Sequence, residues 1–196
     1  MSAPLALIVG LGNPGPEYAD TRHNAGFRFL EAVAREYGAA LRYESRFNAQ
    51  AGKLRVGDVE LWLAAPQTFM NRSGDAVARI AAYYKIAPMD ILVAHDELDL
   101  PVGVVRLKSG GGAGGHNGLS DIIEKIGSNA FARLRIGIGR PARSSEVADY
   151  VLHRAGAAEQ QAVDAGIDQA RALLPEIVAG DLPRAMQRLH TKTEAS

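Results

Sequence analysis

The sequence predicts an α/β fold, built as a single three-layer domain with a mixed, mostly parallel twisted sheet and helices on both faces. Apolar runs typical of buried strands alternate with amphipathic helical patterns along the chain, which is the pattern of a sheet covered by helices. One pair of strand-like segments is joined by a tight turn, which adds antiparallel pairing. The 196 residues contain neither a repeat nor a linker, so residues 1–196 are expected to form one domain around one core.

Strands are expected where aliphatic residues cluster. Residues 47–56 and 59–65 are strand-like and meet at Gly57-Asp58, which favours a hairpin turn. Three further aliphatic runs predict strands, of which the first two are apolar throughout and therefore buried on both faces. These runs are 5–9, 91–94 and 134–138.

Helices are expected where apolar residues recur every three to four positions. Such patterns cover residues 24–37, 119–126, 157–174 and 182–190. Ser73 is expected to cap a further helix, and Gly127 to end the helix at 119–126. A polar tail begins at Thr191, so residues 184–196 are predicted to be a short C-terminal helix and tail.

The composition excludes several classes of protein. There is no cysteine, which rules out a disulfide scaffold, a thiolate metal site and a cysteine nucleophile, and fits a reducing compartment. Residues 1–16 have no basic group and are interrupted by glycine and proline, so neither a signal peptide nor a membrane-spanning helix is predicted. A cytoplasmic protein without a membrane partner is expected.

Charge is distributed unevenly along the chain. The 22 basic and 22 acidic side chains cancel overall, but residues 100–143 carry seven basic and two acidic groups, and residues 144–183 carry two basic and seven acidic groups. The basic block suits a phosphate-rich partner such as a nucleic acid. In the alternative interpretation its arginines are solvated or paired with the acidic block. Charge counting leaves both interpretations open.

A glycine string from Gly10 to Gly15 follows the first predicted strand and matches the G-x-G-x-x-G pattern of dinucleotide-binding proteins. That pattern binds a pyrophosphate only if a helix begins at the glycines. Here the next helical pattern begins near Asn24. We therefore favour a rigid turn that fixes Asn13 at the carboxyl end of the strand, with a local Asx turn as the alternative.

A second glycine string, residues 108–118, precedes the helix expected at 119–126. It lacks the Gly-Lys-Ser/Thr sequence of a phosphate-binding P-loop. Its six glycines nevertheless indicate positive φ angles or the close approach of another group, and a helix N-terminus attracts anions. His116 and Asn117 are therefore candidate ligand-binding residues, and a loop without a ligand is the alternative.

His23 is the candidate general base. It lies between the first strand and its helix, near the expected position of Asn13. Asp96 follows a buried strand and is expected at the same edge of the sheet. A neutral imidazole oriented by a carboxylate is a competent base for water. The chain offers neither a G-x-S-x-G elbow nor a Ser-x-x-Lys context, so direct attack by water is predicted rather than a covalent route.

Two further segments have competing interpretations. Residues 95–99 contain enough carboxylates for a hard metal ion, but strand alternation separates them and no HExxH motif completes a ligand set, so no metal site is predicted. In residues 66–74, Phe69 and Met70 are expected either as exposed contacts or as a buried plug. Asn71 offers an amide suited to a peptide group.

Five segments in series resemble the bacterial-type peptidyl-tRNA hydrolase family. They are VGLGNPGPEYADTRHNAGF (9–27), PQTFMNRSG (66–74), HDELDLPVG (95–103), KSGGGAGGHNGL (108–119) and RLRIGIGRP (133–141). The resemblance implies hydrolysis of the ester between a peptidyl group and the terminal ribose of tRNA, which recycles tRNA from prematurely dropped peptidyl-tRNA. It also implies that the reaction needs no metal or organic cofactor.

The same resemblance implies roles for individual residues. His23 is expected to activate water, Asp96 to orient it, and Asn13 to distinguish a blocked from a free aminoacyl ester. Residues expected to contact the peptide or the acceptor end are Tyr18, Phe69, Met70, Asn71, His116 and Asn117, and those expected at the phosphate backbone are Arg106, Lys108 and Arg135. Ala113 and Ser120 depart from the family, in which polar or basic side chains are common at these positions.

The expected partner is peptidyl-tRNA, bound through its acceptor end and phosphate backbone by a monomer without an obligate protein partner. Two other classes of function stay open from the residues alone. An RNA-binding module without catalysis would use the same basic segment but would not need His23, Asp96 and Asn13 together. A nucleotide-dependent enzyme would bind NAD or ATP through the first glycine string.

Overall fold

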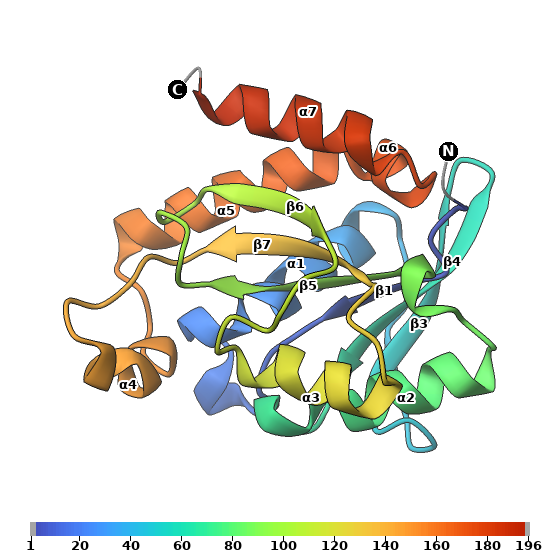
Figure 1. The fold of residues 1–196 in the computed structure, drawn as a ribbon, viewed down its shortest axis with the longest axis horizontal. Helices are drawn as coiled ribbons and strands as arrows, with labels where there is room; N and C mark the ends of the chain where they lie inside the picture. Colours follow the sequence, from blue (N-terminus) through green and yellow to red (C-terminus); the bar gives the residue numbers. More distant parts are fainter. Residues whose placement is uncertain (1–2, 195–196) are drawn as a thin grey trace.

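The computed structural model describes residues 3–194, with side chains to Thr191, and places a seven-stranded sheet between two layers of helices (Figure 1). The strand order is β2-β3-β4-β1-β5-β7-β6. The strands are β1 (Leu7–Gly10), β2 (Arg42–Glu44), β3 (Ala49–Val56), β4 (Val59–Pro66), β5 (Ile91–Glu97), β6 (Val105–Ser109) and β7 (Ala132–Gly137).

Parallel pairing joins the four central strands, and antiparallel pairing adds the outer three. β4, β1, β5 and β7 are parallel, whereas β2, β3 and β6 pair in the antiparallel direction. The predicted mixed sheet is confirmed, and Gly57 turns the hairpin between β3 and β4 with a φ of 60°. Because parallel strands end at one edge, the segments that follow β1, β4, β5 and β7 gather there.

Helices cover both faces of the sheet, as predicted (Figure 1). One face packs against α1 (Ala25–Glu36), α5 (Ala157–Ala172), α6 (Leu174–Val178) and α7 (Leu182–Glu194), and the other against α2 (Ser73–Tyr83) and α3 (Asn117–Ile126). Successive residues of β1 alternate between the two cores, since Ile8 faces the first and Leu7 and Val9 the second. Within the described residues, no helix combines the length and the hydropathy required to cross a bilayer.

Short elements complete the chain. A five-residue helix, α4 (Val147–Val151), follows β7. The 3-10 helices are η1 (Pro16–Tyr18), η2 (Arg22–Asn24), η3 (Met70–Arg72), η4 (Pro88–Asp90) and η5 (Ser144–Glu146).

The start of α1 packs tightly against the sheet because residue 26 is glycine. A Cβ at Gly26 would lie 2.3 Å from the carbonyl oxygen of Ala94 and 2.5 Å from the backbone nitrogen of Leu11, so any side chain would push the helix away. This contact brings η2, which immediately precedes α1, against the ends of β1 and β5. The first glycine string is followed by η1 and not by α1, so it lacks the helix that a dinucleotide site requires.

The structure corrects several local predictions. Ser73 does not cap α2: it is the first residue of that helix, and its hydroxyl donates to the carbonyl of Met70. The helix predicted at 157–174 is confirmed as α5 but ends at Ala172, and α6 follows it with Pro175 in its first turn. β2, β6 and α4 were not predicted.

Candidate active site

Four polar segments converge at the carboxyl edge of the parallel strands. The segment after β1 carries Asn13 and His23, the end of β5 carries Asp96, and the turn after β4 carries Asn71. His116 reaches the same edge at the start of α3. The structure therefore assembles side chains that are as many as 103 positions apart in the chain, from 13 to 116.

His23 is in direct contact with Asp96. The Nδ1 atom of His23 lies 2.8 Å from Oδ2 of Asp96, and the residues are 9% and 3% exposed. Burial lowers the pKa of His23, but the charge of Asp96 and the hydrogen bond outweigh burial, so the pKa rises above its ordinary value of 6.5.

His116 binds the second oxygen of the same carboxylate. Its Nε2 lies 2.8 Å from Oδ1 of Asp96, while its Nδ1 accepts the backbone N–H groups of Gly118 and Leu119 at 3.1 and 3.3 Å. Because Nδ1 accepts, the ring proton is on Nε2 and is donated to Asp96. His116 thus donates a hydrogen bond to the Asp96 carboxylate and is also the N-cap of α3.

Asp96 stays ionised although it is buried. Burial raises the pKa of Asp96, but the two histidines and their hydrogen bonds lower it by more than burial raises it. The pKa of Asp96 therefore lies well below its usual range. The ionised carboxylate accepts one hydrogen bond from each ring. The proton of neutral His23 is therefore on Nδ1, and its Nε2 is unprotonated.

His95 lies behind this cluster. Complete burial, reinforced by the neighbouring His116, lowers the pKa of His95 to about 3. Its Nδ1 lies 2.8 Å from the carbonyl oxygen of Asp96, so the neutral ring donates to the backbone of the residue that holds His23.

Asn13 is fixed by three hydrogen bonds. Its backbone N–H donates to Oδ1 of Asn24 at 2.8 Å, and Nδ2 of Asn24 donates back to its carbonyl at 3.0 Å. The N–H of Met70 donates to Oδ1 of Asn13 at 2.7 Å. The side chain therefore forms no local Asx turn, and its Nδ2 is the group left to donate to a ligand.

Two pockets meet at His23. One, of about 320 Å³, lies between Asp96, the start of α3 and the segment around α4. The other, of about 280 Å³, extends from Asn13 to Leu152. The residues common to both are His23, Asn117, Ala148 and Val151. Among the described residues, Nε2 of His23 has no hydrogen-bond partner, so this nitrogen is available to a molecule bound in either pocket.

The second pocket contains most of the residues expected to contact the substrate. Its walls include Tyr18, Phe69, Met70, Asn71 and Asn117. Phe69 is 59% exposed, with its ring 6.2 Å from that of Tyr18 in an edge-on arrangement, whereas Met70 is only 4% exposed. Both alternatives for residues 66–74 thus occur in part, because Phe69 is exposed and Met70 is buried.

The second glycine string crosses one face of the sheet. β6 is antiparallel to β7 and ends opposite Ala132, the first residue of β7, so the chain must return to the carboxyl edge before α3 begins. Arg133 is 2% exposed and donates to the carbonyls of Gly111 and Gly112. The loop is therefore anchored by a buried guanidinium, which charge counting had placed on the surface.

The basic residues of β6 and β7 share one face of the sheet. Arg106 lies opposite Arg135, and Lys108 lies opposite Arg133. Nε of Arg135 lies 2.8 Å from Oε1 of Glu97.

The alternative in which the arginines of the basic block pair with the acidic block at 144–183 does not hold for two of them. Arg135 pairs with Glu97, and Arg140 pairs with Asp99. The carboxylates of Glu97 and Asp99 are thus each paired with an arginine.

His23, Asp96 and His116 form the grouping that could hold a metal ion among the described residues. One ligand atom from each lies within 4.8 Å of the others. The contacts within the group are hydrogen bonds, so a metal ion would have to displace the proton on each ring.

Several contributors were missed from the sequence. Asn24 fixes Asn13, and Ala148 and Val151 form a wall of both pockets. The position of Asn24 next to His23 was the sequence signal that could have identified it. No such signal exists for Ala148 and Val151, because the position of α4 depends on contacts between distant segments.

Fold and site together define a hydrolytic enzyme of the α/β class, in which a buried carboxylate orients an imidazole toward two pockets. The pattern of the family described as Peptidyl-tRNA hydrolase matches residues 7–196. The chain belongs to the peptidyl-tRNA hydrolase family, as the five segments predicted.

Relatives match over nearly the full chain. The peptidyl-tRNA hydrolase of Methylococcus capsulatus is 56% identical over 184 residues, covering 94% of this chain and 98% of that protein. The peptidyl-tRNA hydrolase of Nitrosomonas europaea is 49% identical over 194 residues, covering 99% and 100%. The crystal structure of peptidyl-tRNA hydrolase from Acinetobacter baumannii is similar with a TM-score of 0.93 and 47% identity, covering 96% of each chain.

Proposed function

We propose that the chain hydrolyses the ester between a peptidyl group and the terminal ribose of tRNA, with His23 as the general base. The observation that carries this proposal is the 2.8 Å contact between Nδ1 of His23 and Oδ2 of Asp96 beside two pockets. A positioned base of this kind accelerates a reaction by roughly 10²–10⁴. The reaction recycles tRNA from prematurely dropped peptidyl-tRNA.

The reaction is direct attack by water. Nε2 of His23 takes a proton from water as the water oxygen attacks the ester carbonyl, and Asp96 stabilises the resulting imidazolium without taking the proton. The tetrahedral intermediate collapses as the bond to the ribose oxygen breaks, and Nε2 returns the proton to that oxygen. Nδ2 of Asn13 and the amide of Asn117 are the candidate donors to the oxyanion, each donor being worth roughly 10²–10³ in rate.

Asn13 also supplies a means of choosing the substrate. Since its Oδ1 is occupied by the N–H of Met70, the side chain presents a donor. A donor suits the carbonyl of a peptide or of another acyl block, whereas the ammonium of a free aminoacyl ester offers only donors in return. The site therefore favours blocked esters.

The remaining contacts divide between the two ends of the substrate. Phe69 and Tyr18 offer aromatic surface on which an unpaired base of the acceptor end can stack. Asn71, His116 and Asn117 border the pockets where the peptide or the last nucleotide binds.

Arg106, Lys108 and Arg135 form the surface for backbone phosphates. Their shared face on β6 and β7 supports this assignment. Binding through phosphates ignores base sequence, which suits an enzyme that acts on many tRNAs.

Substitution of His23 tests the catalytic assignment. In the His23→Ala variant, kcat is expected to fall by roughly 10²–10⁴ while the Kd for tRNA changes less than about twofold, because the base acts on the transition state. The measurements are single-turnover hydrolysis of N-acetylaminoacyl-tRNA and filter binding of tRNA. His153→Ala is the matched control, since His153 is an exposed histidine outside both pockets. A large loss of affinity with unchanged kcat contradicts the role of base.

Salt dependence tests the phosphate surface. The Arg106→Ala and Lys108→Ala variants should each reduce the slope of log Kd against log salt by about one phosphate contact, with weaker binding to every tRNA. Lys53→Ala is a control on β3, at the other side of the sheet. An unchanged slope removes the substituted residue from the phosphate surface.

The monomeric state, the cytoplasmic location and the extent of the domain over residues 1–196 belong to the same proposal. One chain supplies His23, Asp96, His116 and Asn13, so a site assembled without a second copy supports a monomer. The location follows from the substrate, which forms during translation. Sedimentation velocity checks the oligomeric state.

A further inference from the structure

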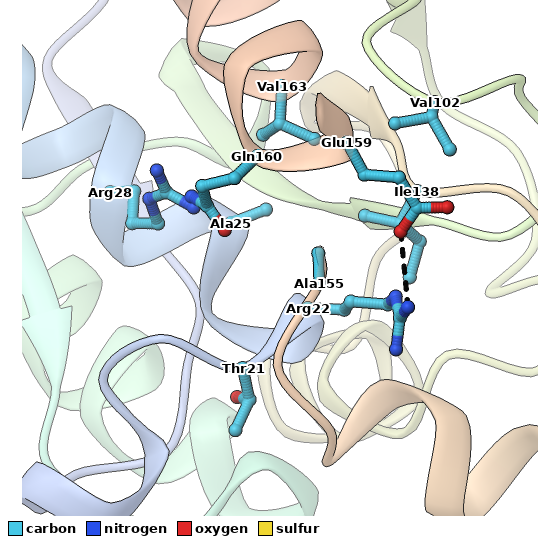
Figure 2. Close-up of a pocket in the computed structure, with 10 residues that line it drawn as sticks. All are labelled: Thr21, Arg22, Ala25, Arg28, Val102, Ile138, Ala155, Glu159, Gln160 and Val163. Carbon is cyan, nitrogen blue, oxygen red and sulfur yellow. Dashed lines mark hydrogen bonds and ion pairs between the residues drawn. The ribbon is translucent and has the colours of Figure 1, made fainter. Parts of the chain in front are cut away.

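A small pocket lies behind the catalytic histidine, between η2, the start of α1 and α5 (Figure 2). Its cavity volume is about 10 Å³, which is the lower limit for a single water molecule. It is therefore too small for a ligand. Its polar side chains act instead on other parts of the chain, as Figure 2 shows for Arg22, which reaches Glu159 across the pocket.

Arg22 joins three segments. It belongs to η2, directly before His23. Its Nη2 lies 3.1 Å from Oε2 of Glu159 on α5, and its Nη1 donates to the carbonyl of Tyr150 on α4 at 3.1 Å. The guanidinium also stacks 4.0 Å above the centre of the Tyr150 ring. Its side chain is only 14% exposed, so these interactions are stronger than those of a solvated surface pair.

The α4 segment packs on the core through Val147, Tyr150 and Val151, and it has few other polar attachments. Within α4, Val151 alone is buried. The backbone N–H of Arg22 donates to the carbonyl of His153 at 3.1 Å, and Thr21 forms an isolated bridge with Arg154. The hydroxyl of Tyr150 donates to the carbonyl of Ile138, just after β7. The polar attachments of the α4 segment are thus concentrated on Tyr150 and on the two residues that precede His23.

The same short helix is a wall of the site. Ala148 and Val151 border both pockets, and Leu152 borders the second. A displacement of Tyr150 would therefore move the surface that faces His23 across the two pockets.

We propose that Arg22 is a positioning residue for the hydrolysis: by holding Tyr150 and Glu159, it fixes α4 as the wall that presses the substrate against His23. The inference rests on the proposed role of His23 and adds a residue outside the two pockets. The proposal gives two consecutive residues different roles: His23 performs the chemistry, and Arg22 holds one wall of the site in place.

A purely structural role is the competing explanation, and the chain contains a matched control for it. Arg28 on α1 pairs with Asp164 on α5 and borders the same small pocket (Figure 2). This pair also joins the α1 region to α5. The contact between Arg28 and Asp164 does not involve α4.

The experiment compares Arg22→Gln with Arg28→Gln by steady-state kinetics on peptidyl-tRNA and by hydrogen exchange. In Arg22→Gln, KM should rise about tenfold and kcat should fall less than about threefold, because substrate contacts are loosened while the His23–Asp96 pair is retained. Exchange at 147–152 should accelerate. Arg28→Gln should leave KM, kcat and this exchange within about twofold of the unsubstituted enzyme.

A second variant reaches the same contact from its other side. Tyr150→Leu removes the ring beneath the guanidinium and should reproduce the rise in KM. The double variant Arg22→Gln/Tyr150→Leu should raise KM by less than the product of the two single effects, because both changes remove the stacking contact. The Arg22→Lys variant keeps the charge opposite Glu159 but loses the planar fork, and should recover part of the affinity for substrate.

Three results overturn the proposal: an unchanged KM in Arg22→Gln, the same change in Arg28→Gln, or additive effects in the double variant. The first includes a fall in kcat without a change in KM, since Arg22 would then act on the base itself. None of these results bears on whether His23 is the base, because the His23→Ala variant answers that question through kcat.

Discussion

The segment before α1 and the start of α3 each place a histidine on Asp96, and the two histidines differ in the nitrogen that they use. His23 binds the carboxylate through Nδ1, and His116 binds it through Nε2. Their ring centres are 5.2 Å apart. The difference lies in the second nitrogen, which faces the pockets in His23 but accepts two backbone N–H groups in His116.

This comparison shows that proximity to a carboxylate does not by itself define a general base. A base must also have a nitrogen that can take a proton from water. Protonation at Nδ1 of His116 would place a donor against the N–H groups of Gly118 and Leu119, which would then lose their acceptor. His116 is accordingly a support for Asp96, and His23 is the residue that can gain and lose a proton at the site of reaction.

Removal of the Asp96 charge, which both histidines contact, should have the largest effect on kcat. In Asp96→Asn, kcat should fall by roughly 10²–10⁴, because the amide neither fixes the tautomer of His23 nor stabilises its imidazolium. The pH profile should change as well. Activity requires neutral His23 and is lost as the pH falls through its pKa, which Asp96 raises above 6.5. Without this charge the pKa falls, so the acid limb of kcat/KM should move to lower pH.

Asp99→Asn is the matched control for this experiment. Asp99 is exposed and pairs with Arg140 instead of with a histidine. Its substitution should leave the acid limb unchanged. An acid limb that stays in place in Asp96→Asn would show that a group other than His23 controls activity.

The contact between His23 and Asp96 was accessible from the sequence because it follows from parallel strands. Both residues lie beyond or at the ends of strands that aliphatic runs identify, and parallel strands end at one edge. β6 was harder to identify, because this edge strand carries Arg106 and Lys108 and lacks a continuous apolar run. Without β6, the sequence could not show that the glycine string crosses a face of the sheet.

Side-chain partners were the least predictable part of the site. The positive charge of residues 100–143 was evident, but its division between a buried anchor at Arg133 and an ion pair at Arg135 depends on strand register. The bond between Arg22 and Tyr150 spans 128 positions. No local periodicity encodes such a contact, because it depends on how the segment after β7 folds back onto η2.

Substitution of His116 should have a smaller effect than loss of Asp96 and should separate its two roles. His116→Asn and His116→Ala both remove a hydrogen bond from Asp96, so kcat should fall about tenfold in each, since His23 keeps its own bond to the ionised carboxylate. Asparagine is a good N-cap and alanine is a poor one, so His116→Ala should lose about 1 kcal/mol more stability than His116→Asn, measured by urea unfolding. A loss of kcat as large as that of Asp96→Asn would contradict the comparison, because it would mean that His116 also carries the proton.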